Sequence, residues 1–414
     1  MNARLQRFCR LLIASHPWVL TLLLRSASLL LFLSRSRLQD SGFSLTSDKP
    51  SILFIDSSTP QSDRDAGAVT IVQYMHLFVD HGWDVYLCPF DQIERADAVG
   101  QLNQSGIHVV LPARHALIPW LRRNASSFQV IFLSRPTMAA TLLPILRSEQ
   151  SITAYYGHDL HFQRFRQEAF HSGHGELNWI ARRFRSVERS ISRRVDISYY
   201  PSADEVMQLQ ALEPDATIKE LPAYCYDFDQ LPEIRLKASR RFLFIGNFRH
   251  QPNVDAVSWL LQAIWPCIRL SLDGVELSIV GSNPPADLMH MTRRHQDIHW
   301  KGWVSDAELS YLYQTSRIVL VPLRYGAGVK HKVVAAVVEG CAVVTTTIGL
   351  QGLPELMDLV GLAKTPDDFA VASSRLMMDD SLWLYRVAAA RNALSARFSS
   401  QSMWRAFDDL HHSI

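Results

Sequence analysis

The feature that most constrains this chain is an alternation of short apolar runs with amphipathic segments, and the alternation begins twice. The first series starts at residues 51–56, SILFID, which precede a helical pattern over residues 70–83 and another apolar run over residues 84–90. The same order starts again at residues 240–248, RRFLFIGNF. Alternation of this kind is typical of parallel sheets that are covered by helices on both faces. The sequence therefore predicts an α/β protein with two Rossmann-like, doubly wound domains that face a central cleft.

The chain length supports this division, because 414 residues are too many for one hydrophobic core. We expect an N-terminal apolar and basic helical segment over residues 1–45, a first domain over 46–235 and a second domain over 236–395. A C-terminal helix over residues 396–414 is expected to pack back on the first domain. The join between the domains is placed within residues 221–239, which contain prolines and lack a regular pattern.

Residues 1–45 are strongly apolar and carry arginines on both flanks. A narrow polar stripe runs along this segment at helical spacing, formed by Thr21, Arg25, Ser28 and Arg35. The pattern favours a helix that lies in a membrane interface. A transmembrane span is the second interpretation, although Arg25 at mid-depth would cost about 3 kcal/mol. A helix packed on the protein itself is the third. We therefore expect contact with a membrane surface.

Composition and missing motifs exclude several classes of function. Apolar residues make up 48% and charged residues 20%, as in an ordinary folded protein. The net charge of +2 gives no global field that favours nucleic acid, so no nucleic-acid partner is expected. The five cysteines form no CxxC pair, which argues against a zinc site and for a reducing compartment. Neither series carries a GxGxxG after its first strand, so a dinucleotide cofactor is not expected.

A helical pattern from residue 329 to 340 begins with two lysines, Lys330 and Lys332. The N-terminal end of a helix carries a partial positive charge and unpaired N–H groups, so lysines there are mildly unfavourable. We interpret them as ligands of an anion, most simply a phosphate or diphosphate. The preceding Gly326 and Gly328 let the backbone approach such a ligand closely. The alternative is a solvated first turn after an ordinary loop.

Four polar side chains gather after the apolar run 151–157, in the stretch GHDLHFQR. They are His158, Asp159, His161 and Arg164. Because the carboxyl ends of parallel strands form the usual ligand-binding edge of a sheet, this cluster is the best catalytic candidate in the first series. A zinc site is the alternative, but no fourth ligand is evident and no metal is expected.

Several stretches together resemble bacterial GT-B glycosyltransferases of the retaining, glycogen-synthase-like type (glycosyltransferase family 4, group 1). They are FIGNFRHQPNVDAV, GWVSDAEL, VPLRYGAGVKHKVVAAVVEGCAVVTTTIGLQGL and, near the start, DRDAGAV. The resemblance extends from about residue 51 to the C-terminus. It implies that the first domain binds an acceptor and the second a nucleotide sugar, with no cofactor or metal. Asp63–Asp65 superficially matches a metal-binding DxD, and we interpret it as loop structure instead.

For the nucleotide sugar, the resemblance implies one set of residues in the second domain. These donor-binding candidates are Gly246, Arg249, Trp303, Val304, Gly326, Gly328, Lys330 and Lys332. Lys330 would contact the diphosphate, and the backbone near Trp303 and Val304 would meet the base. A charged surface turn is the alternative for Arg249, and a place in the core is the alternative for Trp303.

In the first domain, the resemblance places His158 near the reacting centre of the sugar, with Asp159 orienting its neighbours. Gly67, His161 and Arg164 are the candidates that line the acceptor side or the cleft.

The chain departs from the family where relatives read VVEA, because Ala335 replaces the glutamate that holds the ribose hydroxyls. Gln351 replaces a second glutamate, His331 stands where relatives carry glycine, and Glu339 is a candidate substitute one turn further on. The resemblance implies transfer of a hexose to a glycan or lipid-linked glycan in surface polysaccharide synthesis. The alternatives are a catalytically weakened GT-B scaffold in a polysaccharide assembly complex and, more remotely, a sugar-nucleotide epimerase. The sugar, base, linkage and oligomeric state are not determined by the sequence.

A second basic feature lies in the helical pattern over residues 176–196, where arginines gather opposite an apolar face. They are Arg182, Arg185, Arg189 and Arg193. A solvated helix face is the favoured interpretation, and attraction to anionic lipid is the alternative. Together with the N-terminal segment, this feature leads us to expect a cytoplasmic protein that is peripheral on the inner membrane face.

Overall fold

The computed structural model describes residues 48–60, 66–112, 116–146, 150–284, 286–292 and 295–411. The chain divides into two compact units. The first unit is Met1–Ala223 together with Trp404–Ile414, and the second is Tyr224–Met403. The N-terminal helical segment predicted over residues 1–45 lies outside the described residues, as does Asp63–Asp65.

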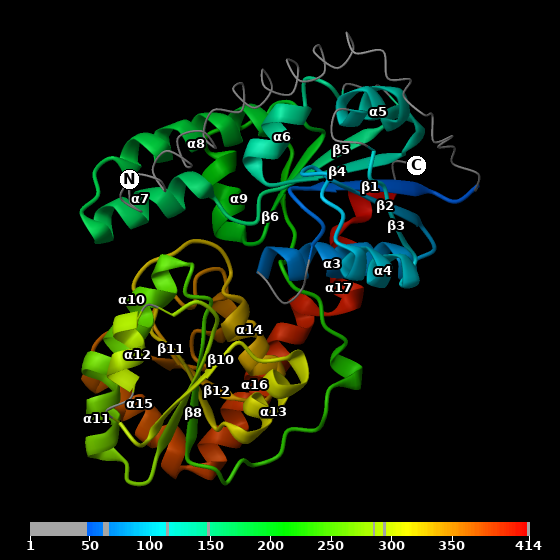
Figure 1. The fold of residues 1–414 in the computed structure, drawn as a ribbon. Coiled ribbons are helices and arrows are strands. Elements are labelled where there is room, and N and C mark those ends of the chain that lie inside the picture. The colour runs from blue at the N-terminus through cyan, green and yellow to red at the C-terminus, as the bar shows by residue number, and fades with distance from the viewer. Residues whose placement is uncertain are drawn as a thin grey trace. The chain divides into compact units, whose positions relative to one another are not determined.

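The described part of the first unit is built on a seven-stranded parallel sheet with the order β3-β2-β1-β4-β5-β6-β7 (Figure 1). Its strands are β1 (Ser51–Asp56), β2 (Asp84–Pro89), β3 (Ile107–Val109), β4 (Val130–Ser134), β5 (Ile152–Tyr156), β6 (Ile197–Tyr200) and β7 (Ile218–Glu220). Its helices are α3 (Ala66–Asp80), α4 (Ala96–Gln104), α5 (Leu117–Asn124), α6 (Pro136–Leu142), α7 (His161–Ser172), α8 (Leu177–Ser192) and α9 (Ala203–Gln210).

Helices cover both faces of this sheet, because successive strand residues point to opposite sides. Leu53 and Ile131 belong to a buried cluster with residues of α5, α6, α7 and α8. Phe54 and Phe132 point the other way and pack in an aromatic cluster with the α3 residues Tyr74 and Phe78. Figure 1 shows the two helical layers, with α5 to α8 on one side of the sheet and α3 and α4 on the other.

The described part of the second unit has a six-stranded parallel sheet with the order β10-β9-β8-β11-β12-β13. Its strands are β8 (Arg241–Ile245), β9 (Glu276–Val280), β10 (Ile298–Gly302), β11 (Ile318–Val321), β12 (Ala342–Thr345) and β13 (Gly361–Leu362). Its helices are α10 (Gln251–Trp259), α11 (Trp265–Ser271), α12 (Ala286–Thr292), α13 (Asp306–Thr315), α14 (His331–Val338), α15 (Pro366–Met378) and α16 (Asp380–Phe398). A π-helical turn, Leu260–Ile264, joins α10 to α11 just before Pro266, which lacks the N–H that a regular turn needs.

The predicted class, two doubly wound α/β units, is confirmed. Two short edge strands, β7 and β13, were not predicted, because three and two residues are too few for a periodic signal. The helix predicted from residue 329 begins at His331, so Lys330 is its N-cap residue.

The boundary between the units differs from the predicted one at residues 235 and 236. Tyr224 already belongs to the second unit, where its hydroxyl donates to the Val329 carbonyl over 3.3 Å. Tyr226 forms a parallel bridge with Ser399 of the same unit. Irregular sequence marked the linker correctly, but the partners of its tyrosines are distant in sequence and left no local signal.

The C-terminal segment also differs in detail from the single helix predicted over residues 396–414. α16 ends at Phe398 in the second unit, and the chain continues as α17 (Ser400–Ala406) and α18 (Asp408–His411). Phe407 lies between these short helices and is fully buried in the aromatic cluster of the first unit. Its ring lies 5.3 Å from Tyr74 and 4.9 Å from Phe78, measured between centroids.

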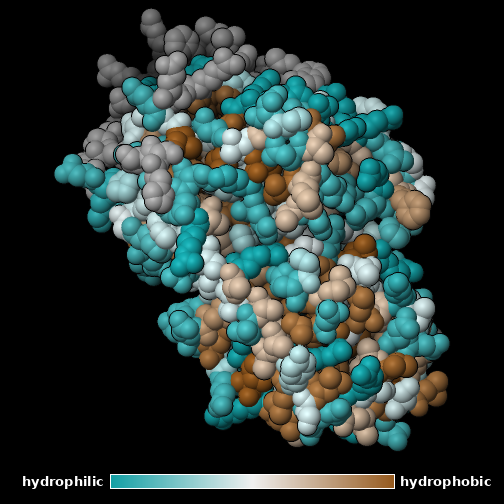
Figure 2. Space-filling view, turned by 180° about the vertical axis from the view of Figure 1, so that it is seen from behind, coloured by the Kyte–Doolittle hydropathy of each residue, from teal (hydrophilic) through white to brown (hydrophobic). Residues whose placement is uncertain are grey.

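Among the residues that the structure describes, none of the helices is both long enough and apolar enough to cross a membrane. Figure 2 shows a surface on which hydrophilic residues alternate with scattered apolar ones. Large apolar side chains are nonetheless exposed on α11, α15 and α16, namely Leu270, Val371, Met378 and Tyr385. Singly exposed apolar side chains of this kind are ordinary in folded proteins.

The buried position of Phe407 predicts that Phe407→Ala lowers the free energy of unfolding of the first unit by about 3–5 kcal/mol, because it opens a cavity in a close-packed aromatic cluster. Chemical denaturation followed by tryptophan fluorescence measures the change. Arg405→Ala, at an exposed position of the preceding helix, serves as the matched control and leaves the transition within about 0.5 kcal/mol of the wild type. A Phe407→Ala transition as stable as that of the control would contradict this account of the C-terminal segment.

Candidate active site

The carboxyl edge of the second sheet reverses its strand order between β8 and β11. Ligands of doubly wound sheets bind at such a switch point, beyond the carboxyl ends of the strands. Two helices begin there, α10 after β8 and α14 after β11. Neither has a side chain that caps its first N–H groups. The edge therefore presents backbone donors and positive helix ends, as an anion site requires.

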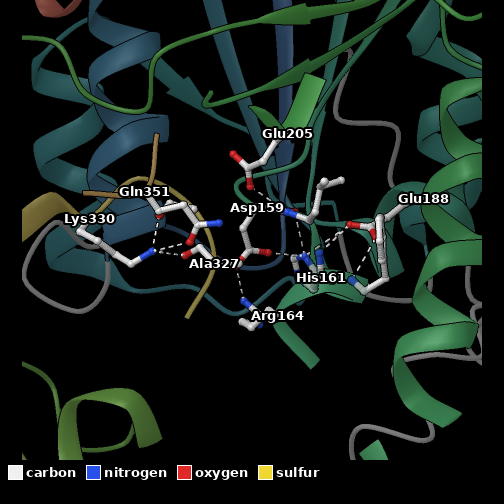
Figure 3. Close-up of polar contacts among 11 residues, drawn as sticks. Asp159, His161, Arg164, Glu188, Glu205, Ala327, Lys330 and Gln351 are labelled. Carbon is white, nitrogen blue, oxygen red and sulfur yellow. Dashed lines mark hydrogen bonds and ion pairs between the residues drawn. The ribbon is translucent and has the colours of Figure 1, made fainter. Parts of the chain in front are cut away.

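Lys330 folds back over the loop that carries it (Figure 3). Its ammonium donates to the carbonyl oxygens of Ala327, over 2.9 Å, and Gly328, and it lies 3.3 Å from the side-chain oxygen of Gln351. Gly326 and Gly328 have φ angles of 136° and 74°, which only glycine adopts easily. The two glycines therefore shape a loop that brings its carbonyl groups to the lysine.

Lys332 links the two helices that begin at the switch point. Its ammonium donates to the side-chain oxygen of Asn253 on α10 over 2.7 Å and lies 5.2 Å from the centroid of the Phe244 ring. Burial, followed by the nearby charge of Lys330, lowers the pKa of Lys332 to about 7. This lysine is poised to gain a proton when an anion approaches.

His331 points away from this edge and into the second unit. Its Nε2 lies 3.1 Å from the Tyr226 hydroxyl, and its ring lies 4.6 Å from the Tyr224 ring. Burial, followed by the charge of Lys332, lowers the pKa of His331 to about 4, so the ring is neutral at physiological pH. The histidine that replaces the family's glycine therefore packs in the interior between two tyrosines of the linker.

Glu339, the candidate replacement for the lost carboxylate, lies at the wrong end of the helix. It is the C-cap residue of α14, whereas the predicted anion site is at the N-terminus. Its carboxylate lies 3.5 Å from the Ser310 hydroxyl, and burial raises its pKa. Ala335 itself is buried within α14. Nothing in α14 replaces the carboxylate that Ala335 lacks.

The other donor-binding candidates divide between open and packed positions. Gly246 follows β8, and a side chain there would come within 2.9 Å of Asn253, so this glycine is needed for packing of α10. Arg249 is exposed, and its guanidinium lies 3.5 Å from the side-chain oxygen of Asn283. Trp303, just after β10, is 60% exposed, which rules out a place in the core, whereas Val304 is buried. Trp303 is thus an open aromatic face at the carboxyl edge.

In the first unit, three of the four predicted side chains after β5, those of Asp159, His161 and Arg164, form one polar network. The Asp159 carboxylate is buried and lies 2.7 Å from both the Arg164 guanidinium and the His161 Nδ1 (Figure 3). Burial opposes its ionisation, but Arg164 and then His161 hold the pKa of Asp159 well below its usual range. Burial and the charge of Arg164 together lower the pKa of His161, so that ring is neutral. His158, half-buried, has a left-handed backbone with φ 48°, a strained conformation that is common at functional sites.

Two buried glutamates that sequence reasoning missed hold this loop in place. Glu188 on α8 is fully buried and accepts from the backbone N–H groups of His161, over 2.9 Å, and Phe162, over 3.2 Å. Glu205 on α9 accepts from the Leu160 N–H over 3.1 Å. They cap the start of α7 from other helices, and burial raises the pKa of Glu188. No local motif marks such caps, because both glutamates lie more than 25 residues along the chain from the groups they bind.

A second missed feature lies beside His158, at the switch point of the first sheet between β1 and β4. The Asp56 carboxylate, at the end of β1, is 2% exposed and accepts from the Arg135 Nε over 2.8 Å. Arg135 follows β4 and has a left-handed backbone with φ 66°. A charged residue at the end of one apolar strand and another directly after a second strand could have suggested this pair. Only the parallel pairing of β1 with β4 shows that the two residues meet.

The remaining first-unit candidates are less informative. Gly67 lies in the first turn of α3, half-buried. Within the described ranges, the structure has no group of three or more His, Cys, Asp or Glu side chains that could hold a metal ion. Arg189 on α8 and Arg193, its C-cap residue, both pair with Glu213 in the loop after α9. Arg182 and Arg185 on α8 are exposed. Two of the four arginines of the predicted basic face therefore form ion pairs within the first unit.

Comparisons with known proteins agree with this geometry. Residues 239–379 match the family model for "Glycosyl transferases group 1". No curated protein matches the sequence. Many solved structures share the fold. A mutant of TarM from S. aureus, in complex with fondaparinux, alpha-GlcNAc-glycerol and UDP, has a TM-score of 0.69 and 9% identity, covering 87% of this chain and 99% of TarM.

Two further structures show the same architecture. HepE from Anabaena, in complex with UDP and glucose, has a TM-score of 0.67 and 13% identity over 88% of this chain and 100% of HepE. Sucrose-phosphate synthase from Thermosynechococcus elongatus has a TM-score of 0.63 and 14% identity over 88% of this chain and 100% of that enzyme. At these identities the likeness establishes the fold. The chain therefore has the GT-B fold of these structures, and residues 239–379 of its second unit resemble glycosyl transferases of group 1.

Proposed function

We propose that this glycosyltransferase moves a hexose, with retention of configuration, from a nucleoside diphosphate sugar to a hydroxyl of a glycan or lipid-linked glycan in surface polysaccharide synthesis. One observation carries the donor half of this proposal. At the switch point of the second sheet, Lys330 and Lys332 flank the start of α14, and Lys332 reaches across to α10. The same edge lies inside the region that matches the family model.

The diphosphate would take the place of weaker partners around these lysines. Lys330 now binds neutral carbonyl oxygens of its own loop, and a charged oxygen forms a stronger bond than a neutral one. The structures of TarM and HepE contain UDP. A uracil base would contact the exposed Trp303. The lysines and the helix N–H groups would stabilise the leaving diphosphate. No metal is required in this scheme, because the lysines supply the positive charge.

The acceptor half rests on the first unit. His158 would lie at the reacting centre, and Asp159, fixed by Arg164 and His161, would hold the loop that presents it. Arg164 and Gly67 would line the acceptor side. The strained backbone of His158 supports this role, since such strain persists only where surrounding structure enforces it.

A peripheral place on the cytoplasmic face of the inner membrane is part of the proposal. Arg182 and Arg185 on α8 are exposed, and Phe170, at the end of the preceding helix, is 85% exposed. Exposed arginines attract anionic lipid by about 1 kcal/mol each near the surface. An exposed aromatic side chain adds apolar contact at the interface. This arrangement would bring a lipid-linked acceptor within reach.

One specific observation favours a second candidate, a scaffold that has lost most of its catalytic power. Ala335 removes the expected carboxylate, and Glu339 does not replace it. The ribose hydroxyls would then be left to water or unpaired. Experiments on the donor site separate the two candidates.

Removing the Lys330 ammonium should weaken binding of UDP by about 1.5–3 kcal/mol, the range for hydrogen bonds to charged groups. Isothermal titration calorimetry of Lys330→Ala with UDP measures this. Lys364→Ala, an exposed lysine before α15, is the matched control and retains wild-type affinity. Equal affinity in Lys330→Ala and the control would remove Lys330 from the donor site.

Binding of UDP should also take up a proton. At pH 8 Lys332, with a pKa of about 7, is mostly neutral, and the diphosphate is fully ionised. A bound anion raises the lysine pKa, so about 0.9 proton is taken up per UDP at most, and affinity falls as pH rises above 7. Calorimetry in buffers of different ionisation enthalpy counts the protons. Lys332→Met should abolish the uptake, and a wild type that takes up none would place Lys332 outside the donor site.

Restoring the family's carboxylate tests the scaffold alternative. Ala335→Glu gives the ribose hydroxyls an acceptor and should tighten UDP binding by about 1–3 kcal/mol. Ala335→Gln, of nearly equal size but uncharged, is the control and should gain less. If the protein is instead an active enzyme with an adapted pocket, the wild-type protein binds UDP well, and Ala335→Glu lowers the turnover. Absence of UDP binding by all three folded forms would overturn the nucleotide-sugar proposal.

A further inference from the structure

The carboxyl edge of the first sheet places three charged or titratable side chains on three neighbouring strands. Asp56 ends β1, Arg135 follows β4 and His158 follows β5, and these strands are adjacent in the order β1-β4-β5. The parallel register aligns Ile55 with Leu133, and Ser134 with Tyr156. The ends of all three strands therefore reach the same level of the sheet.

Asp56 is held as a buried anion. Its Oδ1 accepts from the Ser57 N–H over 2.6 Å and from the Arg135 Nε over 2.8 Å. Burial opposes ionisation, but attraction to Arg135 and to His158, with the Ser57 bond, lowers the pKa of Asp56 overall. Because these strand ends reach the same level of the sheet, a negative charge on Asp56 and a positive charge on His158 would stabilise each other.

The backbone at two of the three positions is strained. Arg135 and His158 both have left-handed φ angles, 66° and 48°, although neither is glycine. Among the described residues, only Gln92 and Asn283 share this property. Two strained residues on adjacent strand ends beside one buried carboxylate indicate that the fold enforces this arrangement at some cost in stability.

The charged groups around His158 come from several elements. Asp56 comes from β1, Arg135 from the end of β4, and Asp159 from the loop of His158 itself, with Arg164 and the neutral His161 behind it on α7. Glu188 and Glu205 lie further back, where they bind backbone N–H groups. Each carboxylate beside His158 is matched by a guanidinium, so the two arginines decide how much of each negative charge the imidazole feels.

We propose that Asp56 is a positioning residue for His158: its carboxylate, oriented by Arg135, favours the protonated imidazole, so that His158 serves the transfer as a charged hydrogen-bond donor to the sugar. The catalytic use of His158 rests on the proposed function. The coupling itself is a property of the first unit alone. A general base at His158 would need the neutral ring, which a nearby carboxylate disfavours.

The experiment measures the His158 pKa by NMR in the full chain with ¹³C-labelled histidine rings. The chain has 16 histidines, so the His158 signal is assigned by its loss in His158→Gln. Asp56→Asn should lower the His158 pKa by about one pH unit, because it removes a negative charge at short range. Arg135→Gln should raise it, because it removes a competing positive charge.

Opposite shifts of the His158 pKa in the two variants indicate electrostatic positioning. A merely structural disturbance would move the His158 pKa in the same direction in both variants. Asp84→Asn removes a carboxylate at the opposite, amino end of the same sheet, at the start of β2, and should leave the His158 pKa unchanged. If Asp56→Asn fails to fold, Arg135→Gln still provides a result that can overturn the proposal. A His158 pKa that does not rise in Arg135→Gln, or does not fall in a folded Asp56→Asn, overturns the proposal.

The catalytic part has its own readout in the pH profile of kcat. If the charged imidazole is required, activity falls as pH rises through the His158 pKa. This alkaline limb of the profile shifts to lower pH in Asp56→Asn and to higher pH in Arg135→Gln. A limb that stays fixed while the NMR pKa moves shows that the charge of His158 is not used. The NMR measurement needs no substrate, so failure of the proposed glycosyl transfer and failure of the coupling are told apart.

Discussion

The parallel register of each sheet is the constraint on which the rest of the structure depends. In the first unit it brings the ends of β1, β4 and β5 to one level, so that Asp56 pairs with Arg135 at the same sheet edge as His158. Asp56 and His158 are more than 100 positions apart in the sequence. In the second unit it sets α10 and α14 side by side, joined by the bond from Lys332 to Asn253. Both candidate sites therefore lie at points where the strand order reverses.

The two candidate sites lower the stability of the fold in different ways. In the second unit the cost is electrostatic, since Lys332 is buried near Lys330 at the positive end of a helix. In the first unit it is conformational, since His158 and Arg135 adopt left-handed backbone angles. Bound diphosphate would relieve the first cost. The strained backbone of the first unit is held in place by buried carboxylates, namely Asp56 on the sheet and Glu188 and Glu205 behind the loop.

Ala335 sets the candidate donor site apart from the motif that this part of the sequence resembles. The anion-binding features around α14 are all present, namely its uncapped N-terminus, the glycine loop and both lysines. The carboxylate expected for the ribose is not, and the nearest glutamate on the helix is committed to its other end. In the proposed donor complex, the lysines and helix N–H groups would hold the diphosphate, whereas no carboxylate of α14 would hold the ribose.

Much of the fold could be predicted from the sequence, because strand and helix patterns are local and the alternation of the two admits few topologies. The local patterns also predicted that Lys330 and Lys332 lie near the start of a helix and that His158 follows a strand, as the structure has them. What the sequence could not reveal was which side chains meet. That His331 turns inward to Tyr226, that Glu188 caps α7, and that Arg135 binds Asp56 were decided by the tertiary structure alone. Such contacts join residues from separate crossovers, and their geometry follows from strand pairing and helix packing over the whole unit, which leave no periodic trace along the chain.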